Sequence, residues 1–341
     1  MIAEKPGRAK LVRRTAPDRS QSLRRAVQLL FLALNLWIGI QFYLFVRFYE
    51  TGGRSLQVSR PPGVEGWLPI AALMNWKAWL LTGQFPALHP AGMFLLLAFV
   101  AISWLFRKSF CSWLCPVGTI SEALSRLSPR GRHWNLPRSV DIPLRALKYI
   151  LLALFLYAVI SMPLDALQAF LNGPYGVIDD VKMLNFFRFL SLAGGIVLAA
   201  LVLLSVFIRN FWCRYLCPYG ALLGLPALLS PLRIRREPAR CIDCAKCAKA
   251  CPAALPVDKL VSIRSAECTA CLECVAVCPA EGALNIAVRK RPLPAWAIAA
   301  GIAVIFLGIT AAARLTGHWN TNVPSELYQY LIPHAQQFTH P

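Results

Sequence analysis

The chain has 341 residues, of which 57% are hydrophobic and only 15% are charged, and its formal net charge is +20. Soluble domains carry about 25% charged residues, so this composition argues against a soluble protein and for a membrane protein. A charge of +20 would suggest nucleic-acid binding if it covered one surface, but here the basic residues sort by predicted membrane side, which excludes nucleic acid as the partner. The twelve cysteines fall into four groups with regular spacing inside each group, a pattern typical of metal or redox sites.

Five stretches have the apolar character and length of a membrane-spanning helix, roughly 20 residues. In chain order they are 26–46, 91–106, 149–164, 189–208 and 292–313. The stretch 67–81 carries Lys77 between two tryptophans, and we expect it to lie along the membrane surface. The predicted fold is a membrane all-α protein with about five transmembrane helices.

The distribution of lysine and arginine predicts the orientation. If the N-terminus is inside, segments 1–25, 107–148 and 209–291 face the cytoplasm and hold 29 of the 36 basic residues. The positive-inside rule therefore predicts a bacterial inner-membrane protein with its N-terminus in the cytoplasm and its C-terminus in the periplasm. Residues 1–25 would form a basic cytoplasmic tail facing anionic lipid, and residues 314–341 a periplasmic tail.

The first two cysteine groups form an internal repeat within the predicted four-helix region 26–230. The motifs FCSWLCPVG and WCRYLCPYG each follow an inward-running span, 102 residues apart. Their cysteines are Cys111, Cys115, Cys213 and Cys217. Residues four apart share a helical face, so both pairs can converge at the inner membrane surface, with Trp113 and Tyr215 at interfacial depth. We interpret such a site as a third metal or cluster site, or as a pair of redox-active dithiols. The alternative is that these cysteines are buried small residues at helix ends.

The other two groups repeat the spacing C-x2-C-x2-C-x3-C-P of bacterial two-cluster ferredoxins. In that arrangement the first three cysteines bind one 4Fe–4S cluster, and the fourth binds the other cluster. One cluster is therefore assigned to Cys241, Cys244, Cys247 and Cys278, and the second to Cys268, Cys271, Cys274 and Cys251. Zinc also binds C-x2-C pairs, but two complete copies with the trailing proline favour iron–sulfur clusters. Residues 231–291 would form a cytoplasmic α+β ferredoxin module, inserted before the fifth span.

This combination resembles the NapH/NosR/CcoG-type membrane polyferredoxins over residues 26–291. The resemblance implies several spans, paired CxxxCP motifs at cytoplasmic helix ends and a double 4Fe–4S module. NapH-like and NosR-like members pass electrons from the quinol pool toward periplasmic reductases, and CcoG-like members are linked to copper reduction. The chain differs from all three. A basic segment of 25 residues stands where NosR-like proteins have a flavin-binding domain, and a fifth span follows the ferredoxin unit where NapH-like proteins usually stop. A tail of 28 residues stands where CcoG-like proteins have a β-domain.

Four histidines fall on the predicted outer side: His89, His318, His334 and His340. His89 opens the second span and His318 follows the fifth, so both would lie at the outer interface. A neutral imidazole there can accept a proton from a quinol headgroup, which makes His89 and His318 the candidate quinol site. Two ordinary interfacial histidines are the alternative. Asp179 and Asp180 lie in an outer loop and receive no role.

The leading hypothesis is an electron-transfer subunit that connects membrane quinol to a partner, either a flavin-binding protein or a periplasmic reductase, through two 4Fe–4S clusters. The second hypothesis is a copper-handling or metal-reducing assembly factor that uses the CxxxCP thiols, since soft thiolates suit Cu(I). No methionine-rich or histidine-rich tract accompanies these thiols. The third hypothesis is a redox sensor, but the sequence contains no recognisable output domain.

Overall fold

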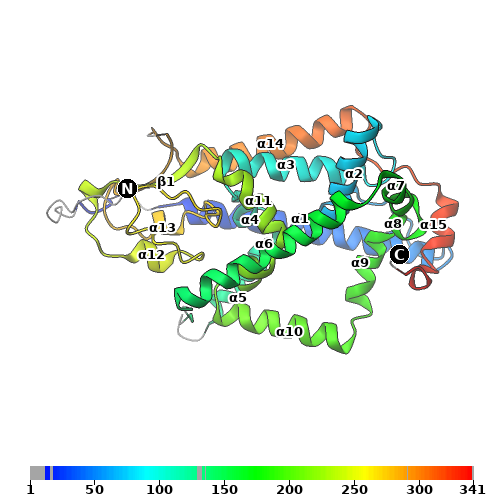
Figure 1. The fold of residues 1–341 in the computed structure, drawn as a ribbon, viewed down its shortest axis with the longest axis horizontal. Helices are drawn as coiled ribbons and strands as arrows, with labels where there is room; N and C mark the ends of the chain where they lie inside the picture. The colour runs from blue at the N-terminus through cyan, green and yellow to red at the C-terminus, as the bar shows by residue number, and fades with distance from the viewer. Residues whose placement is uncertain (1–11, 16–17, 129–132, 135, 290, 340–341) are drawn as a thin grey trace. The chain divides into compact units, whose positions relative to one another are not determined.

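A computed structural model describes residues 12–15, 18–128, 133–134, 136–289 and 291–339, so residues 1–11 of the predicted basic tail and His340 lie outside the described residues. The chain forms two compact units, each assembled from three separate stretches (Figure 1). Unit 1 contains residues 1–32, 99–152 and 200–305, and unit 2 contains residues 33–98, 153–199 and 306–341.

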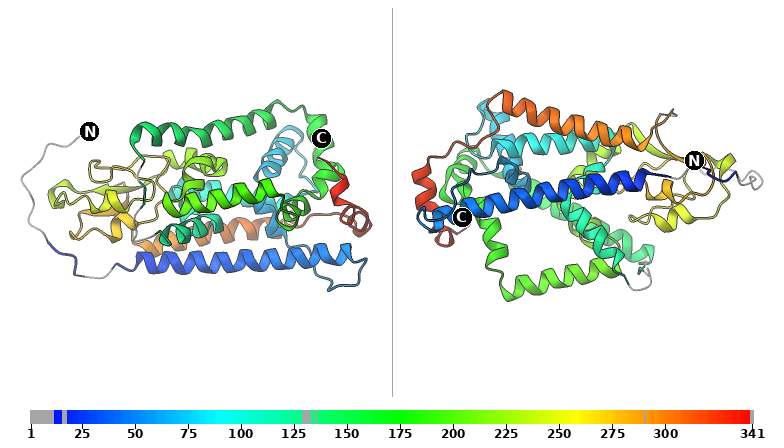
Figure 2. Two further views of the ribbon diagram at one scale, coloured as in Figure 1. Left: turned by 90° about the horizontal axis from the view of Figure 1, so that it is seen from below. Right: turned by 180° about the vertical axis from the view of Figure 1, so that it is seen from behind.

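The predicted spans correspond to five helices: α1 (Ser20–Glu50), α3 (Pro90–Phe106), α6 (Arg138–Ser161), α10 (Leu192–Phe207) and α14 (Ala295–Leu315). Within the described residues, α1, α6 and α14 are long and apolar enough to cross a membrane, and α1 is one continuous helix (Figure 2). A fourth crossing results if α10 is counted together with α9 (Asp179–Arg188), which meets it at 82°. The sequence predicted five crossings. The structure gives three or four because α10 has 16 residues and α3 has 17, ending where Arg107 takes a left-handed φ of 61°.

Short helices and a small sheet make up the rest of unit 1. The helices are α4 (Ser109–Trp113), α5 (Pro116–Arg126), a π-helix (Trp212–Leu216), α11 (Pro218–Leu228), a 3-10 helix (Pro238–Arg240), α12 (Lys246–Ala250) and α13 (Glu273–Ala276). Strands β1 (Leu232–Arg236), β2 (Leu284–Val288) and β3 (Arg291–Pro292) form an antiparallel sheet in that order, with Ile234 opposite Ile286. Alternate residues of β1 are apolar and buried, as expected when one face of a sheet packs on a core.

Unit 2 has its own apolar core and its own short helices. These are a 3-10 helix (Pro62–Trp67), α2 (Pro69–Thr82), α7 (Leu164–Asn172), α8 (Pro174–Val177), α15 (Ser325–Leu331) and a second 3-10 helix (Ala335–Gln337). One core cluster joins Phe45, Ile178 and Leu331, which come from its three separate stretches of chain. A second cluster packs Met74 of α2 against Leu167 of α7.

Lys77 is a charged residue in the middle of the apolar helix α2. Hydrogen bonds to backbone carbonyl oxygens explain how its ammonium group is accommodated there. Its ammonium group donates to the carbonyl oxygens of Val159 and Ile160, both at 2.9 Å, and to that of Met162. These carbonyls lie at the C-terminal end of α6, where the last turn of a helix has no partners of its own and its dipole favours a cation.

Replacing this cation should destabilise unit 2. We expect Lys77→Met to lower the free energy of unfolding by about 1.5–3 kcal/mol, because the helix-end carbonyls lose a charged donor. The measurement is thermal unfolding of the purified protein in detergent. The exposed Lys259 provides the matched control. Lys259→Met should change the free energy of unfolding by less than about 0.5 kcal/mol. Equal effects of both substitutions would contradict this account.

Candidate metal centres and a buried charge cluster

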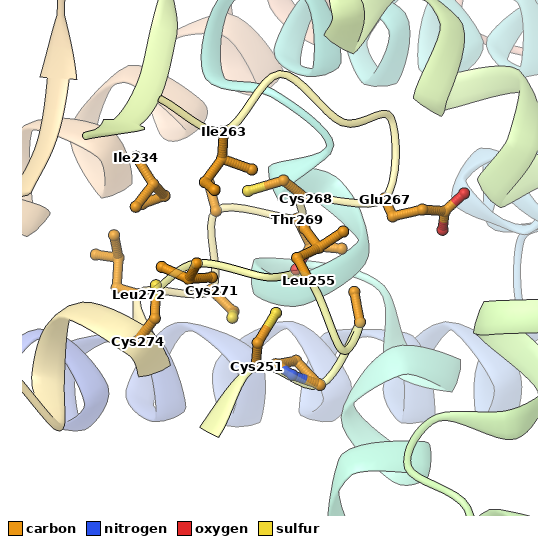
Figure 3. A pocket seen from close by; sticks show the side chains of 14 residues that line it. Ile234, Cys251, Leu255, Ile263, Glu267, Cys268, Thr269, Cys271, Leu272 and Cys274 are labelled. Atoms are coloured by element: carbon orange, nitrogen blue, oxygen red, sulfur yellow. The ribbon is translucent and has the colours of Figure 1, made fainter. Parts of the chain in front are cut away.

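Two small cavities lie in the ferredoxin part of unit 1. The cysteines that line the first are Cys241, Cys244, Cys247 and Cys278. Those that line the second are Cys251, Cys268, Cys271 and Cys274 (Figure 3). Each cavity thus combines three cysteines of one repeat with the last cysteine of the other, the crossed pattern that the spacing predicts. Four thiols around a cavity fit a 4Fe–4S cluster, which is held by four cysteine thiolates.

A single small ion fits these residues less well. A structural zinc site needs four ligands about 2.0–2.3 Å from one point. In the described part of the chain, no three His, Cys, Asp or Glu side chains are placed to hold one metal ion. The sulfur atoms therefore surround a space suited to a cluster.

The two ferredoxin loops turn in the same way. Asp243 and Ala270, just before the second cysteine of each repeat, have φ values of 54° and 51°. Ala245 and Leu272, just after it, have φ values of 54° and 62° and directly precede α12 and α13. Residues other than glycine rarely adopt this left-handed conformation, which is held where a site requires it. The repeat is therefore matched in backbone geometry as well as in spacing.

The two cavities differ in shielding from solvent. Cys244 in the first is exposed, whereas Cys268 and Cys274 in the second are buried. Burial raises the pKa of the Cys247 and Cys251 thiols to about 11. Since thiolate is the ligand form, the positive charge of bound iron must drive deprotonation.

The four CxxxCP cysteines lie within electrostatic range of one another in unit 1. Cys111 belongs to α4 and Cys213 to the π-helix, while Cys115 and Cys217 are the residues just before α5 and α11. A thiolate at Cys213 would be repelled by thiolates at the other three positions. Burial raises the pKa of Cys111 to about 11 and that of Cys115 to about 12. The repeat thus brings both pairs to one place.

The glycine of each motif allows this close approach. A side chain at Gly118 would place its Cβ 2.3 Å from the carbonyl oxygen of Cys111, a distance that no larger residue can adopt. In the second motif, the backbone N–H of Gly220 donates to Cys217 Sγ at 3.3 Å. Both CP segments begin a helix, whose positive N-terminal end favours a thiolate.

A buried cation, Lys108, stands beside these cysteines. Its side chain is 3% exposed, and its Nζ would lie 3.5 Å from a Cβ placed on Gly220. Burial by itself would lower the pKa of Lys108, but the charges of Cys111 and Glu267 outweigh burial and raise it. In the sequence, Lys108 counts only among the basic residues of segment 107–148. The clue to a role is its position three residues before Cys111.

The first CxxxCP motif contacts the loop of the second ferredoxin cavity directly. Ser112 Oγ donates to the carbonyl of Thr269 at 2.6 Å, and Trp113 Nε1 donates to that of Ala270 at 3.1 Å. Glu267, which precedes Cys268, pairs with Lys148 and turns away from the cavity (Figure 3). The Trp113 ring is fully buried and holds this loop, and its depth relative to the membrane stays a prediction.

The second motif is anchored in a corresponding way. Tyr215 donates from its hydroxyl to Asp141 Oδ1 at 2.6 Å and is 1% exposed. Its predicted interfacial depth stays a prediction. Asp141 pairs with Arg214 and Arg145, and Arg145 donates to the carbonyl of Ala253 at 2.9 Å, two residues after Cys251. Aromatic residues at the same place in both motifs thus anchor the cysteine segments.

In unit 2, His89 lies in a buried cluster of charged residues. The side chain is 1% exposed; its Nδ1 is 3.0 Å from Arg60, and its Nε2 is 2.9 Å from the carbonyl oxygen of Gly176 and 3.2 Å from Asp179 Oδ1. Arg60 also pairs with Glu65 and Asp180, both at 2.7 Å. Burial disfavours an imidazolium, but Asp179 and Glu65 outweigh burial and raise the pKa of His89 to about 9.

Glu65 is affected in the opposite direction. Although burial would raise the pKa of a carboxyl group, Arg60 and His89 lower that of Glu65 to about 2. The ring centroid of His318 lies 4.1 Å from that of Phe85. The two candidate quinol residues therefore differ: His89 is enclosed by ionised groups, and His318 packs on an aromatic ring.

Comparison with known proteins supports an iron–sulfur function for both cysteine regions. A family described as "4Fe-4S binding domain" matches residues 88–137 and 190–237, and these segments contain the two CxxxCP motifs. A family described as "4Fe-4S dicluster domain" matches residues 233–279, most of the ferredoxin region. No solved structure gives a significant match.

Relatives extend the similarity to most of the chain. The protein YccM of Escherichia coli (strain K12) is 49% identical over 326 residues, which is 93% of this chain and 91% of YccM. The regulatory protein NosR of Pseudomonas aeruginosa is 36% identical over 53% of this chain and 25% of NosR. The ferredoxin-type protein NapH of Escherichia coli is 29% identical over 40% of this chain and 46% of NapH. The chain therefore belongs to the family of YccM, among the NapH- and NosR-type membrane polyferredoxins that bind 4Fe–4S clusters.

Proposed function

We propose that this membrane iron–sulfur protein passes electrons between the quinol pool and a partner oxidoreductase through a chain of clusters. The observation that carries the proposal is the contact of the first CxxxCP motif with the loop of the second ferredoxin cavity, through Ser112 and Trp113. Two ferredoxin cavities and a third cysteine group thus follow one another within unit 1. Bound clusters would supply one-electron chemistry, while the protein positions them and adjusts their potentials.

The two ferredoxin cavities would each hold one 4Fe–4S cluster, with the crossed cysteine sets given above. The group Cys111, Cys115, Cys213 and Cys217 would hold a third cluster. Three features support it: four thiols within electrostatic range, two helix N-termini, and the buried ammonium of Lys108. Together they compensate the negative charge that thiolate ligands bring into a buried site.

We further propose five membrane crossings, with α3 and the bent α9–α10 pair crossing alongside α1, α6 and α14. The N-terminus and ferredoxin region would lie in the cytoplasm of a bacterial inner membrane and the C-terminus in the periplasm. The division of the chain supports this orientation. All segments predicted to face inward belong to unit 1, which holds 29 of the 36 lysines and arginines, as the positive-inside rule requires of one side.

Iron content and EPR spectra test the number of clusters. We expect about 12 iron atoms per chain after anaerobic purification, four for each cluster. The double variant Cys213→Ala, Cys217→Ala should lose about four of them and keep the two ferredoxin signals. Cys274→Ala should lose the second ferredoxin signal, so each variant serves as the control for the other. If the wild type holds about eight irons and the double variant holds equally many, no cluster occupies the CxxxCP group. Stoichiometric copper there would favour the metal-handling hypothesis.

Lys108 should raise the reduction potential of the third cluster. Since reduction adds negative charge, we expect Lys108→Met to make that potential more negative by roughly 60 mV or more. Lys108→Arg should retain most of the wild-type value. The exposed Lys246, next to Cys247, is the matched control, because water screens its charge and Lys246→Met should shift its own cluster far less. Equal shifts in redox titrations followed by EPR would contradict this role.

Membrane vesicles test whether electrons pass from quinol to the clusters. A short-chain quinol should bleach the visible iron–sulfur absorbance of wild-type vesicles, with dithionite defining complete reduction. In the Cys213→Ala, Cys217→Ala variant we expect the rate to fall at least about tenfold, because an intermediate cluster is missing from the route. Bleaching by dithionite without bleaching by quinol would show that quinol is not the donor.

A further inference from the structure

Positive charge in the ferredoxin region gathers on the first repeat, whose cavity includes the exposed Cys244. Residues 233–264, which hold this repeat, contain eight lysines and arginines and three acidic residues. Residues 265–282, which hold the second repeat, contain three glutamates and neither lysine nor arginine. The two cavities therefore differ in the charge of their surroundings as well as in exposure.

Three exposed cations are interleaved with the cysteines of the first cavity. Arg240 directly precedes Cys241, and Lys246 directly precedes Cys247. Lys249 follows two residues after Cys247, on the same short helix α12 as Lys246. Positive side chains thus lie on the loop that carries the predicted cluster ligands.

The N-terminal segment brings a fourth cation to this cavity. Backbone hydrogen bonds join residues 12–14 to residues 279–281, directly after Cys278. Arg13 is exposed and pairs there with Ala280, which lines the cavity. We call the four exposed cations that border the first cavity the basic rim: Arg13, Arg240, Lys246 and Lys249.

The carboxylates of this surface do not neutralise the rim. Asp243 is exposed but pairs with Arg236 at 3.6 Å, and Glu237 and Glu281 are the other exposed acidic residues beside these segments. Among the described residues, no salt bridge involves a rim cation. The rim is therefore free to meet an anionic surface.

Water screens the exposed rim charges, so they have little effect on a cluster inside the cavity. Their field acts outward, where complementary charge raises the rate at which a partner associates and sets its orientation. Anionic lipid also attracts basic residues. Lipid over this rim, however, would cover the exposed cysteine and separate the cavity from any soluble electron carrier. Cations placed on the ligand loop itself instead direct an acidic protein to the cluster.

We infer that the basic rim docks a small acidic electron-carrier protein, which exchanges electrons with the cluster of the first cavity. The inference rests on the proposed function, in which the clusters pass electrons to a partner, and it specifies the cavity and the charge of that partner. The carrier takes one electron at a time, so the carrier is reduced and the cluster iron is oxidised. No covalent bond of this chain forms or breaks.

Binding to the full-length protein in nanodiscs of neutral phosphatidylcholine tests the inference. The probe is flavodoxin, a small acidic one-electron carrier, and biolayer interferometry gives the affinity at low and high salt. We expect the triple variant Arg240→Glu, Lys246→Glu, Lys249→Glu to bind about tenfold or more weakly at low salt, because repulsion replaces attraction. High salt should remove most of this difference. Carbodiimide should cross-link flavodoxin carboxylates to Lys246 or Lys249 of the wild type.

Two comparisons separate docking from misfolding and from general charge effects. The exposed Arg264 follows Ile263 of the second cavity, and Arg264→Glu should bind as the wild type does. The milder variant Lys246→Gln, Lys249→Gln should show an intermediate loss with both ferredoxin EPR signals intact. Cytochrome c, a basic carrier, should not bind to the wild type.

Equal affinity of the wild type and the triple variant, or an equal loss in Arg264→Glu, overturns the inference. It is also overturned if flavodoxin does not bind and anionic lipid protects Lys246 and Lys249 from an amine-reactive reagent, since the rim then faces lipid. If flavodoxin fails to bind while quinol still reduces the clusters in vesicles, the inference falls and the electron-transfer function stands. If flavodoxin binds through the rim but quinol never reduces the clusters, the docking surface stands and quinol fails as the electron donor.

Discussion

The cysteine loops of unit 1 depend on side chains that satisfy buried backbone carbonyls. These loops form little regular structure, so many of their carbonyl oxygens lack the ladder partners that strands and helices provide. Arg107, fully buried, donates to the carbonyls of Leu232, Ile263 and Ser265. Together with the bonds from Trp113 and Arg145, this interaction holds the ferredoxin loops against the segments that carry the CxxxCP motifs. An unpaired carbonyl at any of these points would cost about 1–3 kcal/mol, enough to loosen a cluster ligand.

The same constraint explains why so many cations are buried here. Arg24 pairs with Glu122 and Glu273, and Lys148 pairs with Glu267, which lies next to Cys268. A buried ion pair contributes little to net stability, but it fixes one geometry because breaking it leaves an unpaired charge. Such pairs suit a protein whose task is to hold redox centres at constant spacing. They also place positive charge near thiolates, which need it when clusters gain electrons.

The sequence predicted most of the cysteine centres of unit 1 and much less of the structure around them. The spacing of the ferredoxin cysteines predicted the same two sets of four that line the two cavities, because ligand spacing is a local property of the chain; their role as cluster ligands stays a prediction. The iron–sulfur, membrane and electron-transport character was also predictable, and it is confirmed. The burial of Trp113 and Tyr215 against distant partners was not predictable, since an aromatic residue at a helix end suits a membrane interface and a buried hydrogen bond equally well. The partners that bury them, Ala270 and Asp141, are 157 and 74 residues away along the chain.

The extent of the membrane-spanning helices and the pairing of buried charges could not be predicted from the sequence, for related reasons. Hydropathy measures composition, whereas the length of α10 is set by the break that separates it from α9, and that break depends on packing. Likewise, Arg60 and Asp180 are ordinary charged loop residues in the sequence. They become a buried pair only because three distant stretches of chain meet in unit 2. A cluster of this kind costs stability without contributing to iron binding, and positions with such perturbed charges are often functional. Unit 2 thus holds a buried charge cluster of its own around Arg60 and His89.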